Sequence, residues 1–226
     1  MKRLILTLTL VICSFAFQSC NKEEPVRTYD AIVTVKPDPE HMSVTFQLDE
    51  NTVVYPVNYK GTDFSSVEQR ALINYREPTA GEYNMWSSEG PKIYVNWLQF
   101  ILTKDTVPNL GPEENEAEYG NDPVELLDDW LTLAEDGYLN LRFLTLWGDR
   151  GVTHTVNLAY TPEEDNPYCV TFYHNSMGDD KFFERDGIVA FWLGDLPDTG
   201  GQTVDLKVKW QSFSGPKNAN FKYRSR

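Results

Sequence analysis

The sequence predicts an all-β fold, with an N-terminal small barrel followed by a C-terminal β-sandwich. Short segments alternate apolar and polar residues with a period of two, between clusters of Pro, Gly, Asn and Asp. This pattern is typical of half-buried strands. A segment without apolar periodicity divides the strands into two groups, which predicts two domains.

The first group of strand-like segments predicts a barrel domain over residues 28–108. Val44, Phe46 and Leu48 alternate cleanly with polar residues. Several such segments over this length suit a closed barrel better than an open sheet, because closure leaves no exposed edge. The segments cover residues 31–35, 44–48, 53–57, 67–75 and 93–97.

Residues 109–122 predict a linker between the domains. The segment contains Gly, Pro and many acidic residues but no apolar period. Its acidity could suggest a cation site, but a solvated connector has the same composition and is favoured.

The second group predicts the β-sandwich over residues 123–226. Gly137 ends a turn suited to a hairpin, because it readily adopts positive φ. Leu144 and Leu146 change the phase of the apolar residues, which indicates a β-bulge. Many short strands at near-regular spacing are typical of a sandwich. These strands cover residues 138–147, 152–160, 168–174, 188–193 and 204–210.

The first residues predict a signal peptide over 1–19. Lys2 and Arg3 precede an apolar stretch that is too short to cross a bilayer. The small residue Ser19 before Cys20 resembles the lipobox of bacterial lipoproteins, although Phe17 stands where Leu is usual. The resemblance implies lipidation of Cys20; the alternative is an ordinary secretory signal with cleavage elsewhere.

A tether over residues 20–27 connects the predicted anchor to the barrel. Lys22-Glu23-Glu24 resembles the export signal of some Bacteroidetes lipoproteins. This resemblance implies an outer-membrane lipoprotein, with the cell surface favoured over the periplasmic face. The alternative is a charged tether without a sorting role.

Composition excludes nucleic acid as a partner. The formal net charge is −14, and there is no Lys/Arg cluster that could replace counterions around phosphates. Cys169 lies in an apolar strand-like segment, so it is predicted to be a core residue rather than a nucleophile.

No motif in the sequence predicts a metal, a cofactor or an enzyme. His41, His154 and His174 lie far apart, without the close ligand pairs typical of zinc sites. His174 is interpreted as a turn-capping residue. A Ser/His/Asp triad stays open, but there is no Gly-x-Ser-x-Gly motif.

An acidic cluster in the second domain supports one enzymatic alternative, a carboxylate-dependent glycoside hydrolase. Paired carboxylates can hydrolyse a glycosidic bond. Neighbouring Lys181 and Arg185 favour surface ion pairs instead. The acidic residues are Asp179, Asp180, Glu184 and Asp186.

Two aromatic residues in the loop between Gly81 and Gly90 are the candidate ligand-binding residues. Tyr83 and Trp86 lie in a connection where burial in the core is less assured than in a strand. Exposed aromatic rings there would suit a glycan. The alternative is that Trp86 closes one end of the barrel.

Several short motifs resemble the NigD-like lipoproteins of Bacteroidetes. The resemblance implies an OB-like N-terminal barrel and a C-terminal β-sandwich, but no established activity. The leading hypothesis is therefore a non-enzymatic binding or interaction module, with a glycan or a protein as its partner. An immunity-like role ranks low, because only the bacteriocin-associated family name suggests it. Besides the lipobox, the motifs are residues 101–105, 120–123, 128–130, 138–143, 173–175 and 187–191.

Overall fold

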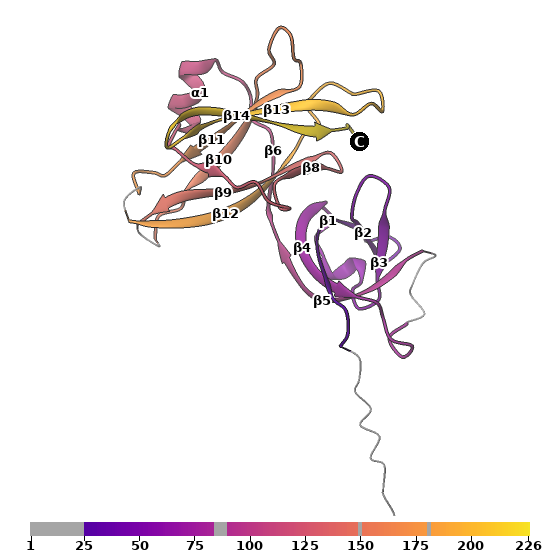
Figure 1. Ribbon diagram of the computed structural model, residues 1–226. Helices are drawn as coiled ribbons and strands as arrows, with labels where there is room; N and C mark the ends of the chain where they lie inside the picture. The colour runs from indigo at the N-terminus through magenta and orange to yellow at the C-terminus, as the bar shows by residue number, and fades with distance from the viewer. Residues whose placement is uncertain (1–24, 84–89, 149–150, 180–181) are drawn as a thin grey trace, which may run out of the picture.

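The computed structural model describes residues 25–83, 90–148, 151–179 and 182–226. Figure 1 shows two β domains, with the N-terminal barrel beside the end of the sandwich. The all-β prediction and the order of the two domains are confirmed. Within the described ranges, no helix is long and apolar enough to cross a membrane.

The barrel closes in the order β1-β2-β3-β5-β4. The alternating apolar residues of its strands point inward and form one core, which explains why the period-two pattern predicts these strands well. The elements are β1 (Tyr29–Asp38), β2 (Ser43–Gln47), β3 (Val53–Pro56), a short 3₁₀ helix η1 (Gly61–Asp63), β4 (Gln69–Arg76) and β5 (Lys92–Phe100).

The chain leaves the barrel at Ile101, earlier than the expected domain end at residue 108. Strand β6 (Leu102–Asp105) pairs in parallel with β12 (Phe183–Trp192) and so belongs to the sandwich. The difference arises because this short strand gains its partner from a segment far along the chain. Its own sequence carries no sign of the sheet that it joins.

The expected linker over residues 109–122 contains helix α1 (Pro112–Tyr119), which packs on the sandwich. Proline at the first helical position and glycine after the last favour this helix. Asn115 and Tyr119 are its buried residues, too few to produce an apolar period. The prediction of a solvated connector is therefore wrong.

The sandwich consists of two sheets. One has the order β10-β11-β13-β14, and the other has the order β6-β12-β9-β7 with β8 added on β9. Apolar residues from both sheets form the larger core of the molecule. The remaining strands are β7 (Glu125–Leu126), β8 (Leu133–Glu135), β9 (Tyr138–Trp147), β10 (Thr155–Tyr160), β11 (Cys169–Asn175), β13 (Val204–Ser212) and β14 (Gly215–Tyr223).

Strand β9 pairs with β12 in a continuous register, so the expected bulge at Leu144 and Leu146 is absent from this described pair. The core-facing position between them is Thr145, and the two leucines lie on the opposite face. The apolar residues change face, whereas the backbone pairing continues. Gly137, at φ +77°, forms the predicted hairpin turn between β8 and β9.

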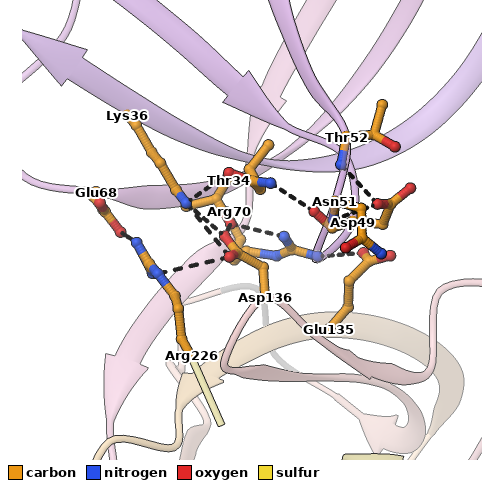
Figure 2. A network of polar contacts seen from close by, with 11 residues as sticks. Thr34, Lys36, Asp49, Asn51, Thr52, Glu68, Arg70, Glu135, Asp136 and Arg226 are labelled. Carbon is orange, nitrogen blue, oxygen red and sulfur yellow. Dashed lines mark hydrogen bonds and ion pairs between the residues drawn. The ribbon is translucent and has the colours of Figure 1, made fainter. Parts of the chain in front are cut away.

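The two domains meet through a buried polar network (Figure 2). The Arg70 side chain of β4 is fully buried, and its Nη2 lies 3.0 Å from Glu135 Oε2 of the sandwich. Its Nε donates to Asn140 Oδ1 at 3.2 Å, and its Nη1 donates to Thr34 Oγ1 at 2.8 Å. Thr34 Oγ1 in turn donates to Asp136 Oδ2 at 2.6 Å.

An apolar cluster lies beside this network. Residues from both domains form it, so the barrel and the sandwich share a small core of their own. The cluster contains Ile32, Leu72, Leu131, Leu133, Ile101, Ile188 and Ala190.

Candidate functional site

A groove lined mainly by polar residues crosses the outer face of the sheet β10-β11-β13-β14, beside helix α1. Its volume is about 480 Å³, which lies within the usual range of small-molecule sites. We call it the helix groove. Its lining residues are Asn109, Pro112, Asn115, Glu116, Asn121, Thr161, Pro162, Thr171, Tyr173, Lys207, Lys209, Trp210, Gln211, Pro216, Lys217 and Asn218.

Strand alternation explains the polar floor of the helix groove. Leu206 and Val208 of β13 are fully buried in the core of the sandwich. The alternate residues Lys207, Lys209 and Gln211 therefore point to the outer face, where they line the groove. Period-two patterning thus builds the core and the groove from the same strand.

Tyr173 of β11 supplies an unpaired hydroxyl at this floor. The residue is 6% exposed, and its ring packs on Tyr119 of α1 at 5.9 Å. The Tyr119 hydroxyl donates to Pro108 O at 2.9 Å, whereas no described residue hydrogen-bonds the Tyr173 hydroxyl. The hydroxyl is not among the buried unpaired polar atoms of the described residues, so it is open to water and to a ligand in the groove.

The wall on the helix side is held by a buried amide. Asn115 is 1% exposed; its Oδ1 accepts from Leu110 N at 2.8 Å and its Nδ2 donates to Asn109 Oδ1 at 2.8 Å. These bonds fix the chain before α1 against the helix. The groove therefore has one preformed wall.

Two lysines of the floor share one carboxylate. Lys207 Nζ lies 2.8 Å from Glu163 Oε2, and Lys209 Nζ lies 3.2 Å from Glu163 Oε1. The hydrogen bonds from Lys207 and then Lys209 lower the pKa of Glu163, and the bond to Glu163 raises the pKa of Lys207. Two ammonium groups therefore face one carboxylate, which leaves one surplus positive charge within this cluster.

The aromatic pair expected in the loop of the barrel is described only in part. Tyr83 is 52% exposed, with Lys92 Nζ 5.8 Å from the centre of its ring. Trp86 lies outside the described residues, as does Cys20. Tyr83 belongs to the barrel, and the helix groove belongs to the sandwich, so these are separate candidate sites.

His154 and His174 meet inside the sandwich, although they lie far apart in the sequence. His154 Nδ1 and His174 Nε2 are 3.0 Å apart, and His174 Nδ1 lies 3.3 Å from Asp122 O. A carbonyl oxygen only accepts, so His174 Nδ1 carries the proton and its Nε2 accepts from His154. His174 is therefore a buried core residue, and its interpretation as a turn cap is wrong.

Burial is the main cause that lowers the pKa of His174 to about 4, and neighbouring His154 adds to it. Asp179 Oδ2 lies 3.5 Å from His154 Nε2 on the far side of the pair. Within the described residues, no group of three His, Cys, Asp or Glu side chains could hold a metal ion.

The acidic cluster of the second domain is distributed among several contacts. Asp186 Oδ2 accepts from Arg142 Nε at 2.8 Å, whereas Asp179 lies beside His154. Asp180 lies outside the described residues. Cys169 is fully buried, which confirms it as a core residue, and burial raises the pKa of its thiol.

Sequence reasoning missed the helix groove because α1 was not predicted. The alternating lysines of β13 were the available signal, since they mark one face of a strand as polar. What the sequence does not show is that α1 and the start of β14 enclose that face.

Family models match both domains of this chain. Residues 32–101 match the NigD-like N-terminal OB domain, and residues 106–223 match the NigD-like C-terminal beta sandwich domain. The two matches meet near Ile101, where the structure places the passage between domains. A search of curated proteins found no significant match.

Solved structures share this two-domain fold. A provisionally named toxin-related protein from Parabacteroides distasonis is 33% identical, with a TM-score of 0.73 over 88% of this chain and 94% of that one. A NigD-like immunity protein from Bacteroides caccae is 20% identical, with a TM-score of 0.60 over 90% of this chain and 100% of that one. A provisionally named lipoprotein from Bacteroides fragilis is 12% identical, with a TM-score of 0.54 over 88% and 99%. The two family models, which together match most of the chain, show that the chain belongs to the NigD-like family.

Proposed function

We propose that this protein is a lipid-anchored outer-membrane protein that acts as a binding module without turnover, and that the helix groove is its binding site. The observation that carries the proposal is Tyr173, which lines a groove of ligand size and whose hydroxyl is open to the groove with no hydrogen-bond partner among the described residues. Hydroxyl and amide groups around it can donate and accept hydrogen bonds. This surface suits a glycan better than an apolar ligand.

The composition of the groove supports binding rather than glycoside hydrolysis. Hydrolysis requires a pair of carboxyl groups on either side of the bond that breaks. Glu116 is the single carboxylate among the described residues of the lining. Glu184, one candidate for the hydrolase alternative, is not among the lining residues, and Asp180 lies outside the described residues.

The Tyr173 hydroxyl can be tested without disturbing the fold. In a soluble form of the mature chain that lacks Cys20, residues 21–226, Tyr173→Phe removes a hydroxyl that no described residue hydrogen-bonds. We expect unchanged stability and an affinity reduced about threefold to tenfold for a groove ligand, the worth of one hydrogen bond. Oligosaccharides would be screened by calorimetry, and the best binder compared between variant and wild type.

Tyr119→Phe is the matched control, because it removes a tyrosine hydroxyl that donates to Pro108 O. It should lower stability and leave contacts of the ligand with Tyr173 intact. Equal affinity of wild type and Tyr173→Phe for every oligosaccharide that binds would place the site elsewhere. The exposed ring of Tyr83 on the barrel would then be the next candidate.

Attachment to the membrane has its own test. The junction of Ser19 and Cys20 motivates the variant Cys20→Ala, which we expect to leave the chain unprocessed or to release it from membranes. Fractionation of cells and labelling with a radioactive fatty acid would measure both effects. A variant as membrane-bound and as fully processed as wild type would contradict lipidation. Protease treatment of intact cells would separate the cell surface from the periplasmic face.

A protein partner is the second candidate. It is favoured by the 33% identical relative from Parabacteroides distasonis, which is provisionally named toxin-related. Capture of one defined envelope protein by the mature chain, unaffected by Tyr173→Phe, would support an immunity-like or other interaction role instead of glycan binding.

A further inference from the structure

We propose that the ligand of the helix groove is an acidic oligosaccharide, whose carboxylate binds Lys209. This inference rests on the proposed function, since it names the class of ligand for the same site. Its first support is the charge of the lining. The chain has a formal net charge of −14, yet the groove is lined by three lysines and one glutamate.

The pairing of these lysines leaves a positive charge for a ligand. Lys217 Nζ lies 2.8 Å from Glu125 Oε2, so it has a carboxylate of its own. Lys207 and Lys209 share Glu163, and Lys209 makes the longer contact of the two, 3.2 Å against 2.8 Å. An ammonium group has three donors, and within the described residues Lys209 hydrogen-bonds and ion-pairs with Glu163 alone.

The partial burial of this group makes the surplus charge useful for recognition. The side chains of Lys209 and Glu163 are 33% and 30% exposed. Water screens charges less there than on an open surface, so a second carboxylate is attracted more strongly. A ligand carboxylate beside Lys209 would complete a set of two cations and two anions.

The other lining groups favour a sugar over an acidic peptide. The Tyr173 hydroxyl has no hydrogen-bond partner among the described residues, and Asn121, Thr171 and Asn218 offer further polar groups along the same groove. Sugar hydroxyls both donate and accept, as these groups do. The volume of about 480 Å³ accommodates a small ligand rather than a protein surface.

The experiment uses two probes that differ only at C6 of each sugar, the carboxylate of tetragalacturonate against the hydroxymethyl group of the neutral galactotetraose of the same linkage. Calorimetry at low salt would measure both with the mature chain. We expect tetragalacturonate to bind more tightly, and Lys209→Gln to reduce its affinity about fivefold while leaving galactotetraose unchanged. Added salt should lower the affinity of the wild-type protein for tetragalacturonate and should lower that of Lys209→Gln less.

Lys222→Gln is the matched control, because Lys222 pairs with Asp205 and does not line the groove. It removes the same charge and should leave both affinities unchanged. Equal binding of the two probes, both weakened by Tyr173→Phe but not by Lys209→Gln, would overturn the acidic ligand and leave the proposed site in place. Binding of neither probe would overturn the acidic ligand for this sugar series, and insensitivity of all binding to Tyr173→Phe would also overturn the site. Tighter, Lys209-dependent binding of a hexaglutamate peptide would point to an acidic protein instead.

Discussion

Replacing Arg70 with methionine is expected to lower the free energy of unfolding by about 3–5 kcal/mol, the cost of breaking a buried ion pair by removing one partner. Its side chain is fully buried, and it contacts Glu135, Asn140 and Thr34 at once. Methionine fills much of the same volume but donates no hydrogen bond. Glu135, 17% exposed, would lose the partner that compensates its charge.

The electrostatics of the pair support a large effect. Burial lowers the pKa of Arg70 and raises that of Glu135, while their mutual attraction opposes both shifts. Arginine stays protonated in proteins, so the buried charge persists and is compensated by its contacts. Because these contacts come from both domains, the variant should also loosen the junction between the barrel and the sandwich.

Urea denaturation followed by circular dichroism and by tryptophan fluorescence would measure the effect. The double variant Arg70→Met, Glu135→Gln should recover part of the loss, because it removes the uncompensated carboxylate. Lys222→Met, at an exposed ion pair, is the control and should change little. An unchanged urea midpoint in Arg70→Met would show that the network does not stabilise the fold.

Strands with one exposed face were predictable from the sequence. In β13, Leu206 and Val208 enter the core and Lys207 and Lys209 remain outside, so the alternation in the sequence is the alternation in the structure. The barrel strands follow the same rule. Local pattern suffices where one face of a strand meets the core and the other meets water.

Features that depend on distant partners could not be predicted in this way. As a charged residue in a strand, Arg70 is expected from the sequence to be exposed. It is buried because Glu135 and Asn140 of the other domain contact its side chain. Strand β6 joins a sheet through β12, far along the chain. A single sequence shows that a residue is charged or that a segment is strand-like, but it does not show which distant residue or strand will pair with it.

The histidine pair and the helix groove could not be predicted from the sequence, for related reasons. His154 and His174 come together because β10 and β11 pair, which places residues at the ends of two strands side by side. Helix α1 has two buried residues and therefore no apolar period. Both features follow from tertiary packing, so a candidate site built from them needs the fold first.

Acidification from pH 6.5 to pH 4 is expected to remove about 3 kcal/mol of folding stability through His174 alone. The folded protein holds the pKa of His174 at about 4, below its ordinary value of 6.5. Between these values the unfolded chain binds a proton that the folded chain does not. The contribution is therefore complete above pH 6.5 and is lost as the pH falls toward 4.

The structure explains why protonation of His174 is unfavourable. Its Nδ1 already donates to Asp122 O, and its Nε2 accepts from His154. A second proton would have to enter at Nε2, where it would break that bond and add a charge at a position 1% exposed. The carboxylates of Asp122 and, beyond His154, Asp179 are the anions nearby, and Asp122 attracts such a charge too weakly to offset burial.

Comparing wild type with His174→Gln over this pH range isolates the effect from that of the carboxylates. The variant should start less stable at pH 7 but lose less of its stability on acidification, because it lacks the titrating group. His41→Gln is the control: His41 is an exposed histidine beside Asp38, outside the sandwich core, and its removal should leave the steep dependence intact. Parallel stability curves for wild type and His174→Gln between pH 4 and 6.5 would contradict the assignment. Titration of the His174 ring by NMR with a midpoint near 6.5 would contradict it independently.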